Sequence, residues 1–165
     1  LILSPTGKIF AYRRSKKDQN YHEKRLQGKW SWGVGGHVSE IDATVLANIH
    51  REINEEVSID NKELNPTDYH LKLLGYINDD LNPVGKVHFG LLYIAVVKSE
   101  QITPKDQEIE EGAFRTFEEL SDICAKPEVE EWSKIALQPL EAYLKSQEFA
   151  LEKKKKAITK KIHFP

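Results

Sequence analysis

A glycine-rich bend followed by a helix that carries three glutamates constrains the fold most. The bend spans residues 33–36, and the helix is expected over residues 45–57. Apolar side chains recur at every fourth position of this helix, namely Val45, Ile49, Ile53 and Val57. This period puts them on one helix face, which can pack against a core. Asp42 precedes the stripe and is expected to cap the first free amides.

The last turn of this helix gathers negative charge. Glu52, Glu55 and Glu56 stand at i, i+3 and i+4, so they share one face. Like charges repel there, the helix dipole disfavours anions at this end, and Arg51 offsets only part of the cost. Hard oxygen ligands that converge on one point suit Mg²⁺ or Mn²⁺, which would explain the arrangement. The alternative is an ordinary solvated helix face.

These residues resemble the Nudix box, which has a glycine, a glutamate and then Arg-Glu-U-x-Glu-Glu-x-Gly-U, where U is a bulky aliphatic residue. The matching positions are Gly36, Arg51, Glu52, Ile53, Glu55, Glu56 and Ile59. One more residue separates Gly36 from Arg51 than in the family pattern, so either Asp42 or Glu40 replaces the first glutamate. Ser58 replaces the last glycine and is less suited to a left-handed, helix-ending conformation.

The resemblance implies an α/β fold of the Nudix type, an α/β/α sandwich with a mixed β-sheet between helices. It would occupy residues 1–147, with a basic C-terminal tail, residues 148–165, packed on it or extending from it. The implied activity is that of a MutT-like hydrolase that uses Mg²⁺ or Mn²⁺ to cleave a phosphoanhydride bond in a nucleoside diphosphate linked to another moiety. Residues 78–90 also resemble a bacterial branch described only as predicted phosphoesterases. Homodimers are common in the family.

The resemblance also assigns site residues. Gly36, Glu52, Glu55 and Glu56 would hold the metal, with Gly36 using its carbonyl oxygen. Arg51 would orient a helix glutamate. Glu52 and Glu111 are alternatives for the general base, since an acidic residue just before the last strand approaches the metal in relatives. Glu108 and Glu110 are further candidates for that position, and all of these acidic residues can also be simply solvated.

Three residues are predicted to contact substrate. Arg14 follows a strand that borders the substrate cleft in Nudix relatives, and its guanidinium matches phosphate geometry. Gly35 lets the backbone approach a ligand closely. Trp32 can stack on a base or ring, although burial in the core is the alternative for both Trp30 and Trp32.

The rest of the chain reads as short strands and helices. Strands are expected at residues 1–3, 8–12, 69–77, 87–97 and 113–117, the first two forming a hairpin. Residues 102–105 are expected to begin a loop, and a short helix is expected from Glu118. A second amphipathic helix over residues 129–143 contains Pro139, which predicts a kink or a break.

Composition narrows the class of protein. The 165 residues suit one domain, 30% of them are charged and the net charge is −2, so no overall attraction to nucleic acid or membranes follows. The apolar run 91–97 is too short for a bilayer. The single cysteine, Cys124, favours a reducing, cytoplasmic compartment. The lysines of the tail form a solvated terminus or, alternatively, contact RNA or an anionic surface.

Two other functions remain open. A non-catalytic module that binds a nucleotide ligand would keep the fold and lose hydrolysis, which the altered box spacing and Ser58 would suit. An isoprenoid diphosphate isomerase is suggested by the resemblance of Trp32 and residues 35–38 to that branch. It would need a cysteine upstream of the glutamate helix, whereas Cys124 lies far downstream.

Overall fold

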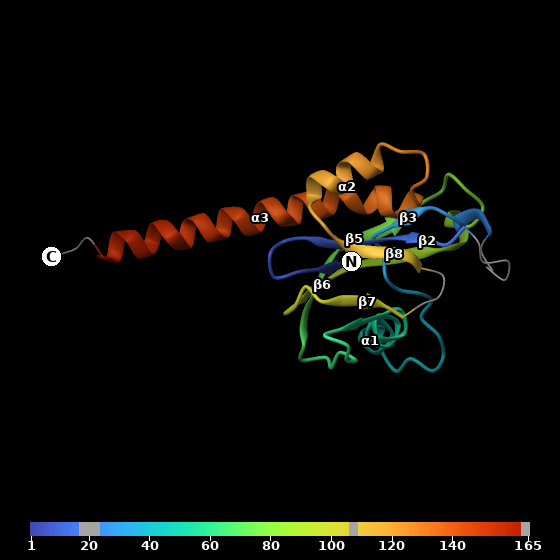
Figure 1. Ribbon diagram of the computed structural model, residues 1–165, viewed down its shortest axis with the longest axis horizontal. Helices are drawn as coiled ribbons and strands as arrows, with labels where there is room; N and C mark the ends of the chain where they lie inside the picture. The colour runs from blue at the N-terminus through green and yellow to red at the C-terminus, as the bar shows by residue number, and fades with distance from the viewer. Residues whose placement is uncertain (17–23, 106–108, 163–165) are drawn as a thin grey trace.

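A mixed β-sheet lies between two helical layers. The computed structural model describes residues 1–16, 24–105 and 109–162, with side chains described as far as residue 148. Helices α2 (Phe117–Cys124) and α3 (Glu131–Ile162) cover one face of the sheet, and α1 (Val45–Glu56) lies on the other (Figure 1). This arrangement confirms the predicted α/β/α sandwich.

The order of the strands explains why the sheet is mixed. Within the described residues the strands of the main sheet are β1 (Ile2–Leu3), β2 (Ile9–Arg14), β3 (Trp30–Ser31), β5 (Tyr69–Asn78), β6 (Phe89–Val97) and β8 (Ile109–Arg115). Their order is β3-β2-β1-β6-β5, and β8 pairs with β2. The predicted hairpin of β1 and β2 is confirmed, and β1 also pairs with β6 in parallel. The apolar strand β6 is therefore flanked on both sides.

A second, two-stranded sheet corrects the prediction for residues 102–105. Strand β7 (Ile102–Pro104) pairs with β4 (Val57–Ile59), so this segment does not begin a loop. Strand β4 follows α1 directly and lies more than forty residues before β7 in the sequence, so no local pattern reveals that the two strands pair. Strand β8 also begins earlier than the expected residue 113, which places Glu110 and Glu111 inside the strand.

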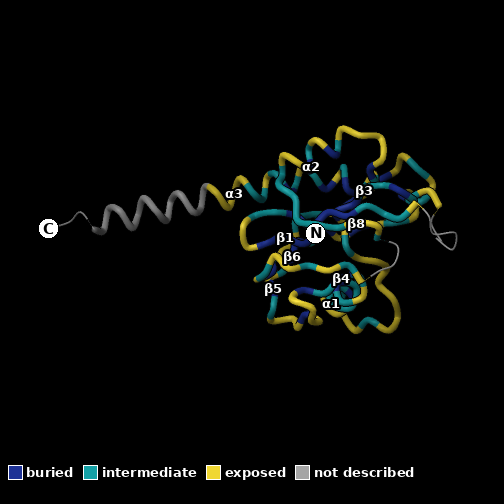
Figure 2. The backbone as a smooth tube through the Cα atoms, viewed as in Figure 1, coloured by how far each residue is buried: buried dark blue, intermediate teal, exposed yellow. Residues whose placement is uncertain are grey.

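Two hydrophobic clusters hold the layers together. Under α1, the fully buried rings of Phe10 and Tyr12 contact a cluster that includes Ile53 and Val57. On the other face, the largest buried side chain is Trp32, which packs in the cluster beneath α2 and α3. Figure 2 shows that buried backbone positions gather in the strands of the sheet, between the helical layers. The apolar stripe of α1 thus faces the core, as its period predicts.

Thr44, rather than Asp42, caps α1. The Thr44 hydroxyl accepts a hydrogen bond from the amide of Ala47 at 3.0 Å. The prediction that Asp42 caps this helix is wrong because its carboxylate is held by Arg51, nine residues further along the chain. Both residue types are good caps, so the sequence pattern alone does not separate them.

Pro139 does not end α3, which continues from Glu131 to Ile162 and extends past the sheet (Figure 1). A proline inside a helix costs about 3 kcal/mol. Ala136 and Leu140, on either side of it, are buried in the cluster beneath α3, and this burial offsets the cost. The tail over residues 148–165 stays a prediction because its side chains from residue 149 on lie outside those described.

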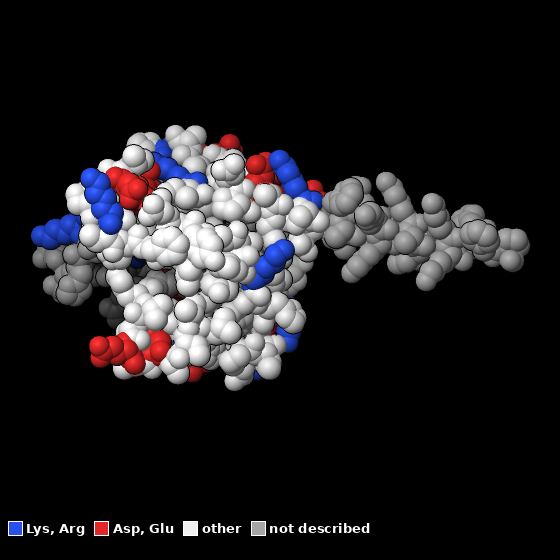
Figure 3. Space-filling model, turned by 180° about the vertical axis from the view of Figure 1, so that it is seen from behind, with Lys and Arg blue, Asp and Glu red and all other residues white. Residues whose placement is uncertain are grey.

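Charged side chains are spread unevenly over one face of the molecule. Seen from behind the view of Figure 1, uncharged side chains cover most of the middle of the molecule and charged ones lie mainly near its margins (Figure 3). Within the described residues, no helix combines the length and the apolar character needed to cross a membrane.

The contact between α3 and the sheet can be tested at Gly90 of β6. A β-carbon there would lie 2.8 Å from the ring of Trp132 and 3.1 Å from Ile77, so either α3 or the strand must move. We expect Gly90→Ala to lower the free energy of unfolding by about 1–3 kcal/mol, measured by urea denaturation. Gly75→Ala in β5 is the matched control, because nothing lies within 4 Å of its new carbon. Equal stability of the two variants would contradict this packing.

Candidate active site

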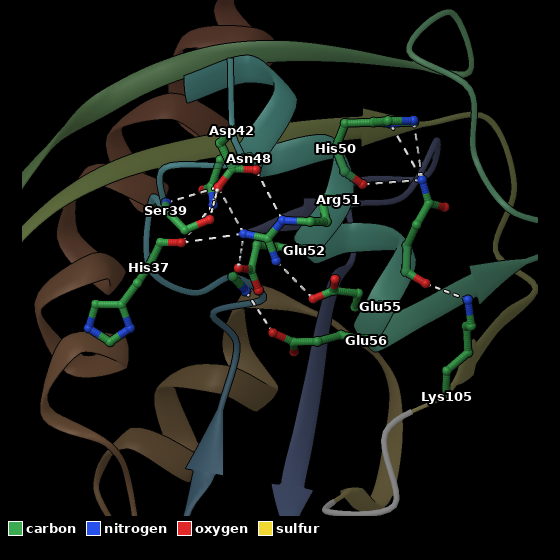
Figure 4. Close-up of polar contacts among 12 residues, drawn as sticks. His37, Ser39, Asp42, Asn48, His50, Arg51, Glu52, Glu55, Glu56 and Lys105 are labelled. Atoms are coloured by element: carbon green, nitrogen blue, oxygen red, sulfur yellow. Dashed lines mark hydrogen bonds and ion pairs between the residues drawn. The ribbon is translucent and has the colours of Figure 1, made fainter. Parts of the chain in front are cut away.

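The bend over residues 33–36 is fixed at both ends by hydrogen bonds. The hydroxyl of Tyr12 in β2 donates to the carbonyl oxygen of Gly33 at 2.7 Å. The amide of Gly35 donates to a carboxylate oxygen of Glu56 at 2.9 Å. Gly35 has a φ of +148°, which disfavours any residue with a side chain. The bend therefore lies against the last turn of α1 (Figure 4).

Gly36 and Glu52 are in close contact. A β-carbon at Gly36 would lie 2.6 Å from each carboxylate oxygen of Glu52. Only glycine therefore lets this carboxylate rest against the backbone of the bend. Glu52 is also mostly buried, with 12% of its side chain exposed. The structure thus brings Glu52 and Glu56 from α1 to one short stretch of backbone.

Arg51 is the centre of the charged network (Figure 4). Its Nε and Nη2 donate to the two carboxylate oxygens of Asp42 at 3.0 and 2.9 Å. Nη2 also lies 2.9 Å from Glu52, and Nη1 donates to Glu55 at 3.0 Å. One guanidinium therefore balances three carboxylates, and it does so through the planar geometry that suits bidentate pairing.

The carboxylate of Asp42 lies inside this network, whereas Glu40 lies outside it. Only 3% of the Asp42 side chain is exposed, and it also accepts hydrogen bonds from Ser39 and Asn48. The hydrogen bonds from Arg51 hold the pKa of Asp42 well below its ordinary value, and they raise the pKa of Arg51 in turn. Glu40 is exposed at the surface. Of the two alternatives, Asp42 is the residue that contacts Arg51.

Asn48 is a structural residue of this site that the sequence analysis missed. Its side-chain amide donates to the carbonyl oxygen of His37 at 2.9 Å and to Asp42 at 3.0 Å, and the residue is buried. It ties the segment between the bend and α1 to the first turns of the helix. A polar residue near the apolar stripe of an amphipathic helix indicates a hydrogen-bonded role. The sequence does not show that its partners are His37 and Asp42.

Ser58 takes a place that needs no glycine. Helix α1 ends at Glu56, and Val57 already has the extended conformation, with φ −139°. Ser58 is the middle residue of β4, where it pairs with Thr103. The expected difficulty of a left-handed residue at this position does not arise, because the helix passes directly into a strand.

The three box glutamates do not converge on one point. Among the described residues, no group of three or more His, Cys, Asp or Glu side chains is placed to hold a metal ion. Glu55 is half exposed and pairs with Arg51, whereas Glu52 and Glu56 contact the bend. The sequence pattern put all three on one helix face, but it could not show that Arg51 would draw one of them aside.

The acidic residues of β8 belong to a different element from the glutamates of α1. Glu111 is exposed in β8, opposite Arg13 of β2, and Glu110 precedes it in the same strand. Glu108 lies outside the described residues. A role for Glu111 as general base stays a prediction.

Arg14 pairs with a carboxylate from another layer. Its Nε donates to Glu130, just before α3, and its Nη2 donates to the hydroxyl of Tyr12 at 3.2 Å. Both members of the ion pair are largely buried, with 18% and 14% of their side chains exposed. A phosphate that drew the guanidinium away from Glu130 would leave that largely buried carboxylate without this partner, and contact of Arg14 with substrate stays a prediction.

Trp32 is completely buried, and its backbone amide donates to the hydroxyl of Ser133 in α3. The ring has no exposed face on which a substrate could stack. The prediction that Trp32 binds substrate is therefore wrong, and the alternative of burial in the core holds for it. Large aromatic side chains bury much apolar area, and the sequence pattern does not distinguish a core ring from a ligand-stacking one.

Residues 1–147 match the family model of the NUDIX domain. Protein YmaB of Bacillus subtilis strain 168 is 32% identical over 148 residues, which cover 86% of this chain and 68% of YmaB.

Solved structures show the same fold. Tm1382, described as a candidate Nudix hydrolase, is 29% identical with a TM-score of 0.62, and the match covers 84% of this chain and 66% of Tm1382. The NUDIX domain of NrtR from Shewanella oneidensis, solved with ADP-ribose, is 14% identical with a TM-score of 0.59, covering 87% of this chain and 83% of that one. At that identity the likeness to NrtR shows the fold alone.

The family model spans the bend, the charged network and both helical layers, and the fold is that of its solved members. The chain belongs to the Nudix family.

Proposed function

We propose that this protein is a Nudix hydrolase that cleaves a phosphoanhydride bond in a nucleoside diphosphate linked to another moiety. One observation carries the proposal: α1 brings the carboxylates of Glu52 and Glu56 against the backbone of Gly35 and Gly36. Tm1382, which is described as a candidate Nudix hydrolase, supports the reaction class. ADP-ribose, the ligand of NrtR, is a nucleoside diphosphate linked to a sugar and belongs among the compounds to test.

The residues at the bend fit a small, hard divalent cation. Mg²⁺ is usually held by one or two carboxylates together with water and substrate phosphates, rather than by a complete protein cage. Glu52, Glu56 and the carbonyl oxygen of Gly36 offer this kind of donor set, and Glu55 would join it only by leaving Arg51. When bound, Mg²⁺ or Mn²⁺ would neutralise the diphosphate and lower the pKa of a coordinated water.

The chain's own residues supply positioning and a base. Arg51, held by Asp42, fixes Glu52 in the orientation that faces the bend, so Arg51 is a positioning residue. A carboxylate beside the attacking water accepts its proton. Glu52, which already contacts the bend, and Glu111 are the alternatives for that role.

The position of Cys124 argues against the isomerase alternative. Cys124 ends α2 and packs against the hydrophobic cluster beneath α2 and α3. Helix α1 lies across the sheet on the other face (Figure 1). A cysteine proton donor for a substrate at the glutamates would have to come from elsewhere, and the sequence contains no other cysteine.

Both carboxylates at the bend should be needed for turnover. Glu52→Gln and Glu56→Gln should each lower kcat by about a hundredfold or more, because each removes charge from the cation site. The measurement is release of phosphate or monophosphate from ADP-ribose, nucleotide sugars, dinucleoside polyphosphates, NADH, CoA and nucleoside triphosphates, with Mg²⁺ and then Mn²⁺. Removal of metal by a chelator should abolish turnover in the same way.

Glu63→Gln is the matched control for these variants. Glu63 is an exposed glutamate whose ion pair with Lys105 is 3.5 Å long, so its neutralisation should leave kcat within about twofold of the parent. Binding of a nucleotide without turnover, with either metal, would contradict hydrolysis and favour the non-catalytic binding module.

Gly36→Ala separates the position of Glu52 from its charge. In Gly36→Ala the new methyl group must push the Glu52 carboxylate away from the bend, because it would otherwise lie 2.6 Å from both oxygens. The end of a flexible side chain can move at little cost, so we expect kcat to fall by about tenfold or more with little change in thermal stability.

Gly33→Ala, in the same bend, is the control for this effect. Its new carbon would meet the hydroxyl of Ser31 at 3.9 Å, an ordinary contact, so activity should be retained. Equal activity of the Gly36 and Gly33 variants would show that the position of Glu52 does not matter for turnover.

A further inference from the structure

Two aromatic side chains lie exposed and stacked on each other beside the active site. Tyr76 of β5 is 61% exposed and Phe89 of β6 is 64% exposed. Their ring centroids are 5.4 Å apart and their planes differ by 26°. Among the Phe, Tyr and Trp side chains that the structure describes, these two are the ones that are exposed. Large apolar groups that gather on a surface usually mark a contact site.

The two rings share the face of the sheet that α1 partly covers. Tyr76 pairs with Leu91 and Asn78 pairs with Phe89, so the rings of Tyr76 and Phe89 are diagonal neighbours on one face. Further along β6, the residues of the same parity, Ala95 and Val97, are buried in the cluster under α1. Residues of the other parity, such as Leu92 and Ile94, belong to the cluster beneath α2 and α3. The face is thus covered at one end of β6 and open at the other.

A pair of histidines joins this open end to the bend. His88, the residue before Phe89, has its Nε2 atom 2.9 Å from Nε2 of His37, which follows Gly36. The Nδ1 atom of His88 lies 2.6 Å from the carbonyl oxygen of Val84, which fixes the orientation of the ring. The exposed rings therefore begin one residue away from a side chain that contacts His37, the residue directly after the bend.

We propose that Tyr76 and Phe89 form an aromatic platform that stacks the nucleobase of the substrate while its diphosphate lies against Glu52 and Glu56. The inference rests on the proposed function and names the part of the substrate that the platform selects. Aromatic side chains stack on the flat face of any base, and such contacts add affinity without needing hydrogen-bond readout. Leu91, partly exposed on the same face, widens the apolar surface beside the rings.

The test compares ligands that differ only in carrying a nucleoside. Calorimetric titration with Mg²⁺ would use the α,β-methylene analogues of ADP, GDP, CDP and UDP, which resist cleavage, and methylenediphosphonate, which has no nucleoside. Tyr76→Ala and Phe89→Ala should each weaken binding of the preferred nucleotide analogue by roughly tenfold, the loss typical of one stacking ring. Binding of methylenediphosphonate should not change, and Tyr76→Phe should behave as the parent.

Leu81→Ala is the control for loss of exposed apolar area. Leu81 is 93% exposed in the turn after β5 and is not a member of the stacked pair, so its truncation should leave all affinities unchanged. An exposed apolar surface can also bind a second copy of the chain. Sedimentation velocity on the same variants measures whether the substitutions change the oligomeric state.

Each outcome bears on one of the two proposals. Hydrolysis of nucleotides by variants that bind every ligand as the parent does would overturn the platform and keep the hydrolase. Nucleoside-dependent binding without hydrolysis would keep the platform and overturn the hydrolase. Equal loss of affinity for the analogues with and without a nucleoside, no binding of either, or conversion of a dimer to a monomer with unchanged selectivity would overturn the platform.

Discussion

The paired hydrogen bonds between Arg51 and Asp42 are the contact on which the site depends. They join a helix to the connection that precedes it, and Asn48 and the carbonyl oxygen of His37 complete the same junction. Removing Arg51 would leave the nearly buried carboxylate of Asp42 without its cationic partner. Removing Asp42 would leave the guanidinium of Arg51 with fewer carboxylates to balance its charge. The glycine bend keeps its place against α1 because this junction closes the segment between them.

The same junction distributes the charges of the last helical turn. Three carboxylates near the negative end of a helix dipole repel one another, and a single arginine relieves two of them, Glu52 and Glu55. Glu56 is instead stabilised by the amide of Gly35. The turn can therefore hold unfavourable charge in the folded state and still leave Glu52 and Glu56 at the bend, where we propose that a cation binds.

Local patterns predicted the elements whose partners are close in sequence, and missed those whose partners are distant. The period of Val45, Ile49 and Ile53 predicted α1, although Val57, expected in the same stripe, begins β4. An apolar run predicted β6. The pairing of β7 with β4, the ion pair of Arg14 with Glu130 and the burial of Trp32 depend on residues from other layers. In the site, the glutamates were visible as a motif, but their division between Arg51 and the bend is a property of geometry.

The direct passage from α1 into β4 has a consequence for how such chains are recognised. A glycine after the glutamates is needed only where the chain must turn back on itself, and here an extended residue makes the exit. The connection before the helix is one residue longer than in the family pattern, and Asp42 in this connection still pairs with Arg51. A search that demands fixed spacing and that glycine would discard proteins like this one, whereas a search for the contacts would retain them.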